Sequence, residues 1–236
     1  MIGFAHRGGM AHWQANTLAA FVNAKAMGAT AVETDAWLTK DGVVVLDHDG
    51  VVRRGWHHVA IANLTRAELP PHIPTLAEYY ALLGTELDVS NDVKDAEAAQ
   101  AVIAAAANAG GTALSRLWLA DSAIERLEKL RPLSAAVHLV YSPTAPDWHR
   151  LRAAVPRLMD RLNSAGVEVL NLKESDANPG VVAAVHHAGG KVFGWNVHTQ
   201  RSAQRLVAMG VDGIYSNDVN ILKGALSAPA NQLSPV

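Results

Sequence analysis

The chain has 236 residues, of which half are hydrophobic and 18% are charged, so it can bury a large core and its length suits a single domain. The formal net charge of −2 and the absence of long Lys/Arg runs give no sign of a nucleic-acid-binding or membrane-surface segment. Cysteine is absent, which excludes disulfides, thiolate metal sites and a cysteine nucleophile. The apolar runs are interrupted well short of the length that spans a bilayer.

The first fifty residues are expected to hold two buried strands, one helix and a hairpin arm. Residues 2–5 form a short apolar strand, and apolar residues at helical spacing follow Asn16, which we expect to cap the first helix. Residues 31–35 form the second strand. The turn at 39–42 is too short for a helical crossover, so residues 43–46 must return antiparallel.

The rest of the chain predicts alternating strands and helices. Residues 50–72 lack periodicity and are expected to form an irregular excursion that shapes access to the functional site. Thr75 caps the next helix. Further strands are expected at 87–94, 117–120, 136–141, 167–172, 192–197 and 213–215, with helices at 96–109, 124–130, 148–165, 180–188 and 202–209.

Without the hairpin arm, the predicted strands number eight. Such alternation indicates an α/β fold with a parallel sheet, and eight units favour a single-domain (β/α)8 TIM barrel with a short hairpin or loop insertion after the second strand. We expect this domain to cover residues 1–226. The remaining residues, 227–236, are rich in Ala, Pro, Asn and Ser and are expected to form a loose tail.

Three acidic residues at predicted strand ends are candidate metal ligands. Glu33 and Asp35 alternate along one strand and therefore project to the same side, and Asp92 ends the neighbouring strand. Carboxylate oxygens without cysteine favour one divalent cation, Mg²⁺, Ca²⁺ or Mn²⁺, over zinc. The alternative is a solvated acid pair at a strand end. Asp88 and Glu86 are the alternatives to Asp92 as the third ligand.

Five further residues follow predicted strands and suit phosphate chemistry. His6 and His48 lie at strand ends near the carboxylates, although most of the eleven histidines must be structural or surface residues. Arg7 has the planar fork that suits a phosphate oxygen, but a structural ion pair is the alternative. Lys94 lies two residues after Asp92, so both point to one face. Trp195 is expected to form an apolar pocket wall, with barrel packing nearly as plausible.

Short motifs in a fixed order give the chain a family resemblance. They cover residues 4–49 tightly and are recognisable at 73–78, 92–94 and 192–218. In this order they resemble the glycerophosphodiester phosphodiesterase family, with Ala15 and Asp92 standing where the family has Glu. The motifs within residues 4–49 are His6-Arg7-Gly8, Asn16-Thr17, Glu33-x-Asp35, Asp41-Gly42 and His48-Asp49.

The resemblance implies metal-dependent hydrolysis of glycerophosphodiesters to an alcohol and glycerol phosphate. It assigns acid–base roles to His6 and His48, a phosphate contact to Lys94, and the cation to the three acidic residues. Two alternatives stay open: a lipid phosphodiesterase acting on lysophospholipids, and an inactive barrel that only binds phosphodiesters. The expected partner is a small phosphodiester. Since the first motif begins at His6, we expect no signal peptide and a cytoplasmic location.

Overall fold

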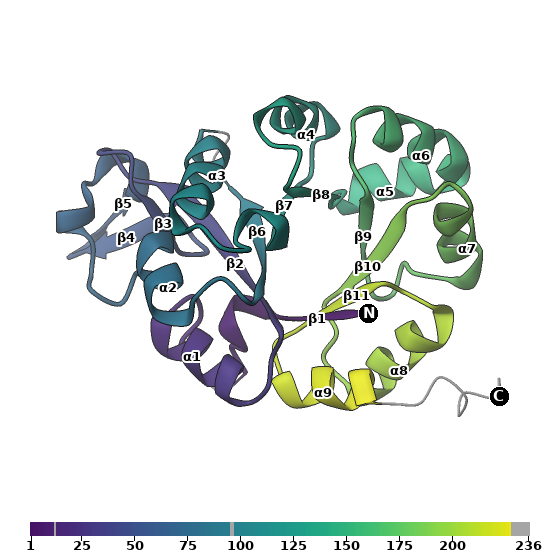
Figure 1. Ribbon diagram of the computed structural model, residues 1–236, viewed down its shortest axis with the longest axis horizontal. Helices are drawn as coiled ribbons and strands as arrows, with labels where there is room; N and C mark the ends of the chain where they lie inside the picture. Colours follow the sequence, from purple (N-terminus) through teal and green to yellow (C-terminus); the bar gives the residue numbers. More distant parts are fainter. Residues whose placement is uncertain (12, 95–96, 228–236) are drawn as a thin grey trace.

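A closed ring of parallel strands forms the centre of the computed structural model, which describes residues 1–11, 13–94 and 97–227 (Figure 1). The ring closes because β1 pairs on both sides: Ala5 lies opposite Val32 on one neighbour and opposite Ser216 on the other. The predicted eight-stranded (β/α)8 barrel is therefore confirmed. In ring order the strands are β1 (Ile2–Ala5), β2 (Ala31–Leu38), β6 (Asp88–Val93), β7 (Leu117–Asp121), β8 (His138–Tyr141), β9 (Val169–Lys173), β10 (Lys191–Trp195) and β11 (Gly213–Ser216).

Helices surround the ring and cover the outer faces of the strands (Figure 1). Within the described residues, no helix is long and apolar enough to cross a bilayer. The α-helices are α1 (Leu18–Ala26), α2 (Leu76–Leu83), α3 (Ala98–Ala109), α4 (Ile124–Leu130), α5 (Ala145–Leu151), α6 (Val155–Ser164), α7 (Pro179–His187), α8 (Gln200–Met209) and α9 (Val219–Ser227). Short 3₁₀ turns are η1 (His6–Gly8), η2 (Ile61–Asn63), η3 (Arg66–Glu68), η4 (Leu114–Arg116), η5 (Arg131–Leu133) and η6 (Arg152–Ala154).

Most predicted strands and helices differ from the observed ones by one to three residues at an end, and two further differences concern the helices. The single helix expected over 148–165 is divided into α5 and α6, because Pro156 lacks an N–H group and its ring would clash with the carbonyl one turn earlier. Helix α9 includes Ser227, the first residue of the predicted tail, while the rest of that tail lies outside the described residues. The Thr75 cap is confirmed, and Glu78 completes a capping box with it.

Large apolar side chains fill the inside of the barrel and form a floor. Phe4 stacks on Tyr215 with ring centroids 4.7 Å apart, and Phe193 and Trp118 pack beside them. This internal cluster comprises Phe4, Ala31, Trp118, Ala120, Val140, Val169, Phe193 and Tyr215. Because side chains alternate along a strand, the next inward positions toward the carboxyl end are open to carry polar groups.

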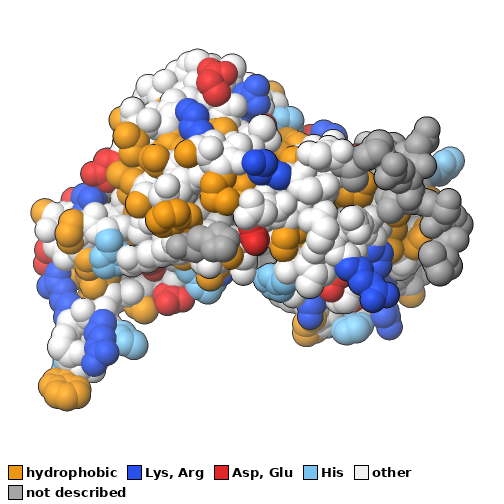
Figure 2. Space-filling model, turned by 90° about the horizontal axis from the view of Figure 1, so that it is seen from below, with side chains coloured by type: hydrophobic (Ala, Val, Ile, Leu, Met, Phe, Trp, Pro, Cys, Tyr) orange, Lys and Arg blue, Asp and Glu red, His pale blue; other side chains and the backbone are white. Residues whose placement is uncertain are grey.

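The insertion after β2 contains two hairpins. Strand β3 (Val44–Leu46) returns antiparallel on β2, as predicted from the short turn. Residues 50–72, expected to be irregular, contain a second hairpin formed by β4 (Val51–Arg54) and β5 (His57–Ala60). The sequence did not reveal this hairpin because apolar and polar residues do not alternate along its strands. Val52 is the one buried residue in β4 and β5. On this side of the molecule, Figure 2 shows a projection whose tip carries hydrophobic, basic and histidine side chains.

Candidate active site

A cavity of about 440 Å³ opens at the carboxyl ends of the barrel strands. Seven of the eight predicted site residues line it, and His48 lies outside the lining. None of residues 50–72 lines it either, so the expected effect of this segment on access stays a prediction. The predicted residues that line the cavity are His6, Arg7, Glu33, Asp35, Asp92, Lys94 and Trp195.

The three candidate metal ligands come from two neighbouring strands. Asp35 lies directly opposite Asp92 in the β2–β6 register, and Glu33 is two residues earlier on the same face of β2. Glu33 and Asp35 are 6% and 1% exposed, so neither charge is well solvated. Burial, and then the nearby charges of Asp35 and Asp92, raise the pKa of Glu33 well above its ordinary value. The site therefore concentrates negative charge that a cation would stabilise.

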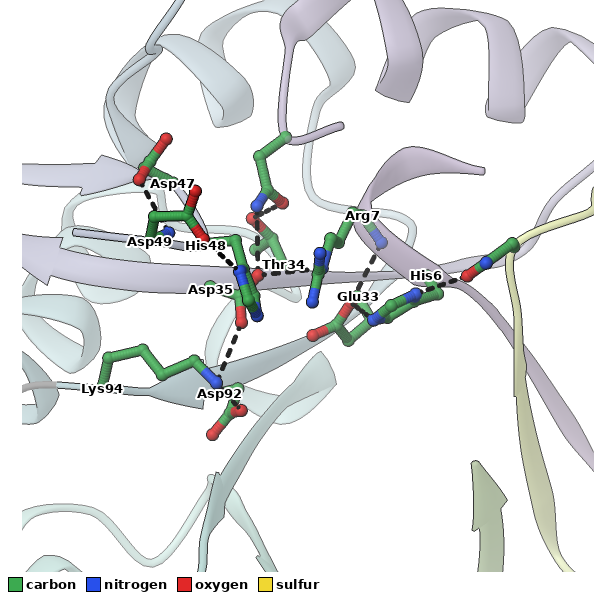
Figure 3. Close-up of polar contacts among 12 residues, drawn as sticks. His6, Arg7, Glu33, Thr34, Asp35, Asp47, His48, Asp49, Asp92 and Lys94 are labelled. Atoms are coloured by element: carbon green, nitrogen blue, oxygen red, sulfur yellow. Dashed lines mark hydrogen bonds and ion pairs between the residues drawn. The ribbon is translucent and has the colours of Figure 1, made fainter. Parts of the chain in front are cut away.

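A left-handed turn after β1 places Arg7 against these carboxylates. Arg7 has φ 50° and ψ 35°, and its backbone N–H donates to Glu33 Oε2 at 3.0 Å (Figure 3). Its Nε lies 3.4 Å from Asp35 Oδ2 but is buried without a hydrogen bond. Gly8 makes the turn possible, since its φ is 79° and a Cβ there would lie 2.8 Å from Ala20 Cβ. The turn thus aims the guanidinium at the cavity.

Lys94 bridges the two opposed aspartates. Its Nζ forms an ion pair with Asp92 and lies 3.2 Å from Asp35 Oδ1 (Figure 3). Burial disfavours the charge on Lys94, but Asp92 and Asp35 outweigh it and raise the pKa of the lysine. Burial also raises the pKa of Asp92, although Lys94 opposes this. Lys94 is therefore cationic and lies at the centre of the acidic group.

His6 is oriented by a residue from the far end of the chain. Its Nδ1 lies 2.6 Å from Asn217 Oδ1, and because an amide oxygen can only accept, Nδ1 carries the proton. The other ring nitrogen, Nε2, lies 3.6 Å from Glu33 Oε2 and faces the carboxylates. Burial lowers the pKa of His6 even though the bond to Asn217 raises it. His6 can therefore exchange a proton through Nε2.

His48 stands on the rim instead of in the cavity wall. Its side chain is 43% exposed and its Nδ1 lies 2.7 Å from Asp49 Oδ1. The half-buried carboxylate of Asp47, which sequence reasoning missed, accepts hydrogen bonds from the backbone N–H groups of Asp49 and Gly50 at 2.9 and 2.8 Å. Gly50 has φ 67°, and a Cβ there would lie 2.4 Å from the ring of Trp37. This turn holds His48 beside the opening.

The prediction that Asn16 caps the first helix is wrong. Thr17 is the cap, and its side chain accepts a hydrogen bond from the N–H of Ala20. Asn16 has a left-handed backbone with φ 56°, and its Nδ2 donates to Asp35 Oδ2 at 3.1 Å while Thr34 donates to its Oδ1 at 2.8 Å. Asn16 therefore fixes the Asp35 carboxylate instead of the helix end.

The opposite wall of the cavity carries polar residues that sequence reasoning did not single out. Asn171 Nδ2 donates to Ser142 Oγ at 3.1 Å, and Asn171 Oδ1 is buried without a partner. The available signal was a polar residue within the apolar run of β9. Asp88 cannot replace Asp92 as a ligand, because it binds Arg116 and Trp118 at the other end of the barrel. Glu86 is exposed and precedes β6, so it is equally remote from the cavity.

The donor set fits a hard divalent cation. No three His, Asp or Glu side chains in the described part of the chain are arranged closely enough to form a finished metal site. Even so, Glu33, Asp35 and Asp92 supply carboxylate oxygens from adjoining strand ends. Burial raises the pKa of both Glu33 and Asp92, although Arg7 opposes this at Glu33 and Lys94 opposes it at Asp92, and a bound cation would favour their ionised forms. Oxygen donors of this type suit Mg²⁺, Ca²⁺ or Mn²⁺.

The chain is similar to known proteins of one family. Residues 6–221 match the model of one family, described as "Glycerophosphoryl diester phosphodiesterase family". The glycerophosphodiester phosphodiesterase of Caldanaerobacter subterraneus subsp. tengcongensis is 24% identical, over 92% of this chain and 94% of its own. Human lysophospholipase D GDPD1 is 40% identical over 30% of this chain and 23% of its own. An Oleispira antarctica phosphodiesterase, solved with the product sn-glycerol-3-phosphate, superposes with a TM-score of 0.80, 22% identity and coverage of 97% of both chains.

Proposed function

Because the chain belongs to the glycerophosphodiester phosphodiesterase family and is a phosphoric diester hydrolase, we propose that it cleaves glycerophosphodiesters to an alcohol and glycerol phosphate with one divalent cation. The observation that carries this proposal is the convergence of two cations, three carboxylates and His6 on one cavity at the carboxyl end of the barrel. In TIM-barrel enzymes this end carries the chemistry.

Glu33, Asp35 and Asp92 would hold the cation. When bound, it would supply Lewis-acid polarisation of a phosphoryl oxygen. Arg7 and Lys94 reach into the same cavity from η1 and from the residue after β6, so they can neutralise the remaining phosphate charge. Asn16 holds one oxygen of Asp35 and thereby keeps its carboxylate oriented.

His6 and His48 are the proposed proton carriers. Hydrolysis of a phosphodiester needs a base to activate the nucleophile and an acid to protonate the leaving alkoxide, each contributing about 10²–10⁴-fold. His6 exchanges a proton through Nε2, since Asn217 occupies Nδ1. His48, on the exposed rim, is proposed to carry out the second proton transfer. An inactive binding barrel would need neither histidine, so their presence favours an enzyme.

A panel of substrates tests the proposal and separates it from its alternative. Glycerophosphocholine, glycerophosphoethanolamine, glycerophosphoglycerol, lysophosphatidylcholine and phosphatidylcholine are assayed for their hydrolysis products, with and without EDTA. We expect small glycerophosphodiesters to be the best substrates, ahead of phosphatidyl lipids. The local similarity to a lysophospholipase D favours lysophosphatidylcholine as the second candidate. Absence of hydrolysis of every diester with added metal would contradict both functions.

A further inference from the structure

The β4–β5 hairpin exposes the most accessible large hydrophobic side chain among the described residues. Trp56 lies at its tip and is 94% exposed, whereas the next, Leu82 on α2, is 58% exposed. Figure 2 shows that this side of the molecule projects beyond the body. A tryptophan carries a large apolar ring with one polar N–H, which suits it to a boundary that is apolar on one side and wet on the other.

Apolar packing and hydrogen bonds fix the base of the hairpin to the rest of the chain. Val52 is 7% exposed and packs in a separate apolar cluster beneath the hairpin. The N–H of Ile61 donates to the carbonyl of Gly50 at 2.8 Å and closes the base of the hairpin. Arg54 donates to the carbonyl of Glu68 at 2.7 Å, which ties one strand to η3. Since the base is fixed and Trp56 contacts none of this core, the tip is available for a contact outside the chain. The cluster comprises Val45, Val52, Ile61, Leu64, Leu69 and Ile73.

The tip is basic on a chain that is acidic overall. Residues 51–60 contain two arginines, two histidines and no acidic residue, while the whole chain carries a formal charge of −2. Arg53 Nε donates to the carbonyl of Gly55 at 3.2 Å, so its side chain is held at the turn that also carries Trp56. The basic residues of the hairpin are therefore not evident from the net charge of the whole chain. The tip therefore combines an aromatic ring with positive charge in a very small area.

We propose that the β4–β5 hairpin docks on an anionic lipid bilayer, with Trp56 in the interfacial region and Arg53 at lipid phosphates, while Arg54 stays paired with Glu68. Tryptophan is the residue type that membrane interfaces favour, and basic residues add attraction to anionic lipids. A protein partner would need about 800 Å² of complementary surface, which a narrow tip with one aromatic ring does not provide. A bilayer interface can accommodate the insertion of a single aromatic side chain.

Docking would also orient the enzyme. The base of the hairpin, Gly50, follows His48 and Asp49 directly, so this base adjoins the rim of the cavity. Docking would therefore hold the enzyme at the bilayer through an element that is anchored next to the rim. This inference concerns where the enzyme sits and not which bond it cleaves, so it stands or falls separately from the proposed function.

Co-sedimentation of the full chain with vesicles tests the docking. Vesicles of phosphatidylcholine alone are compared with vesicles containing phosphatidylserine, at low and high salt. We expect binding to the phosphatidylserine vesicles that weakens with salt. Trp56→Ala should lower this binding about tenfold or more. Arg53→Glu changes the charge by two units and should lower it about 25-fold, since one basic residue near the surface contributes about fivefold.

Two matched variants control for these changes. Leu82→Ala removes an exposed apolar side chain from α2, and Arg157→Glu reverses an exposed charge on α6. Both should bind vesicles as the unchanged chain does, and all four variants should hydrolyse a soluble glycerophosphodiester at the unchanged rate. Equal vesicle binding by Trp56→Ala and the unchanged chain would overturn the proposal. So would a dimer in light scattering that Trp56→Ala dissociates, because the tip would then be a protein interface.

Discussion

Both ends of the barrel have a glutamate close to a histidine, but the pKa of the glutamate is lowered at one end and raised at the other. At the amino end, His138 Nδ1 lies 2.9 Å from Glu168, and the Trp118 ring stacks on His138 at 4.0 Å. Although burial opposes it, the hydrogen bond from His138 helps to lower the pKa of Glu168. At the carboxyl end, burial and neighbouring carboxylates instead raise the pKa of Glu33.

This difference separates a structural network from a site. At the amino end each carboxylate has near partners: Trp118 Nε1 and Arg116 both donate to Asp88, at 2.9 and 3.0 Å. At the carboxyl end three carboxylates share two cations, and Arg7 Nε has no hydrogen bond. Buried charge without full compensation is unstable by itself and is typical of a place where a ligand completes the network.

Removing divalent cations should have the largest effect on activity, because the proposed cation site lies at the carboxyl end of the barrel. We expect excess EDTA to abolish hydrolysis and Mg²⁺, Ca²⁺ or Mn²⁺ to restore it. A cation at a hundredfold excess over its Kd should also stabilise the fold by about 2.7 kcal/mol, measured as a rise in Tm. Asp35→Asn should lose that rise. Full activity in excess chelator would contradict the metal assignment.

Replacing either of the two proposed proton carriers should have the second-largest effect on activity. We expect His6→Ala and His48→Ala each to lower kcat by about 10²–10⁴-fold, because each removes a proton-transfer group. Metal binding, followed by calorimetry, should stay nearly intact. Loss of the metal in either variant would show that the histidine acts as a ligand instead.

Asp92 and Lys94 should respond to metal in opposite ways. Asp92→Ala should raise the metal concentration needed for half-maximal activity, and excess metal should partly restore the rate. Lys94→Ala should lower kcat by about 10²–10³-fold, since the charge developing on the phosphate loses a partner, and added metal should not restore it. The measurement is the rate as a function of metal concentration. Identical profiles for the two variants would show that this strand has been misinterpreted.

At the amino end, a histidine substitution should change stability and leave catalysis alone. His138→Ala removes the bonds to Glu168 and the stacking on Trp118. We expect a loss of about 1 kcal/mol, which lowers the Tm of a chain of this size by about 2–4 °C. The kcat should stay within about twofold of the unchanged enzyme. A large fall in kcat would mean that the two ends of the barrel are coupled.

The smallest expected effect is a pH dependence of stability at the amino end. The folded-state pKa of Glu168 is lowered, so its contribution is present above the unfolded pKa and is lost as pH falls through the folded pKa. The stability difference between the unchanged chain and Glu168→Gln should therefore be largest near neutral pH and should shrink below about pH 4. Denaturant unfolding at several pH values measures it, and a difference that grows in acid would contradict it.

The sequence predicted the fold well because its signals are local. Alternating apolar runs and helical spacings lie within a few residues of each other, and the short turn at 39–42 required an antiparallel return. The period of two along β2 likewise predicted that Glu33 and Asp35 share a face, and the register confirms their common side. The chemical roles of these residues stay predictions.

Other features depend on partners distant in the sequence and were missed or misread. Asn16 has the composition of a cap, but its bond to Asp35 spans 19 residues and its backbone is left-handed. The partner of His6, Asn217, is 211 residues away. The β4–β5 hairpin buries only one side chain fully, so the alternation that reveals most strands is missing. Local sequence patterns do not indicate which distant residues form hydrogen bonds, nor do they reveal strands that bury few side chains.

The closure of the ring through β1 has a consequence for biosynthesis. The first strand made is completed by the last, because β1 pairs with β11 and His6 is held by Asn217. A nascent chain that lacks residues 213–217 leaves β1 with a bare edge and His6 without its orienting partner. Such long sequence separations also slow folding. Truncated or stalled chains should therefore be inactive, since the site can be assembled only after synthesis has passed Asn217.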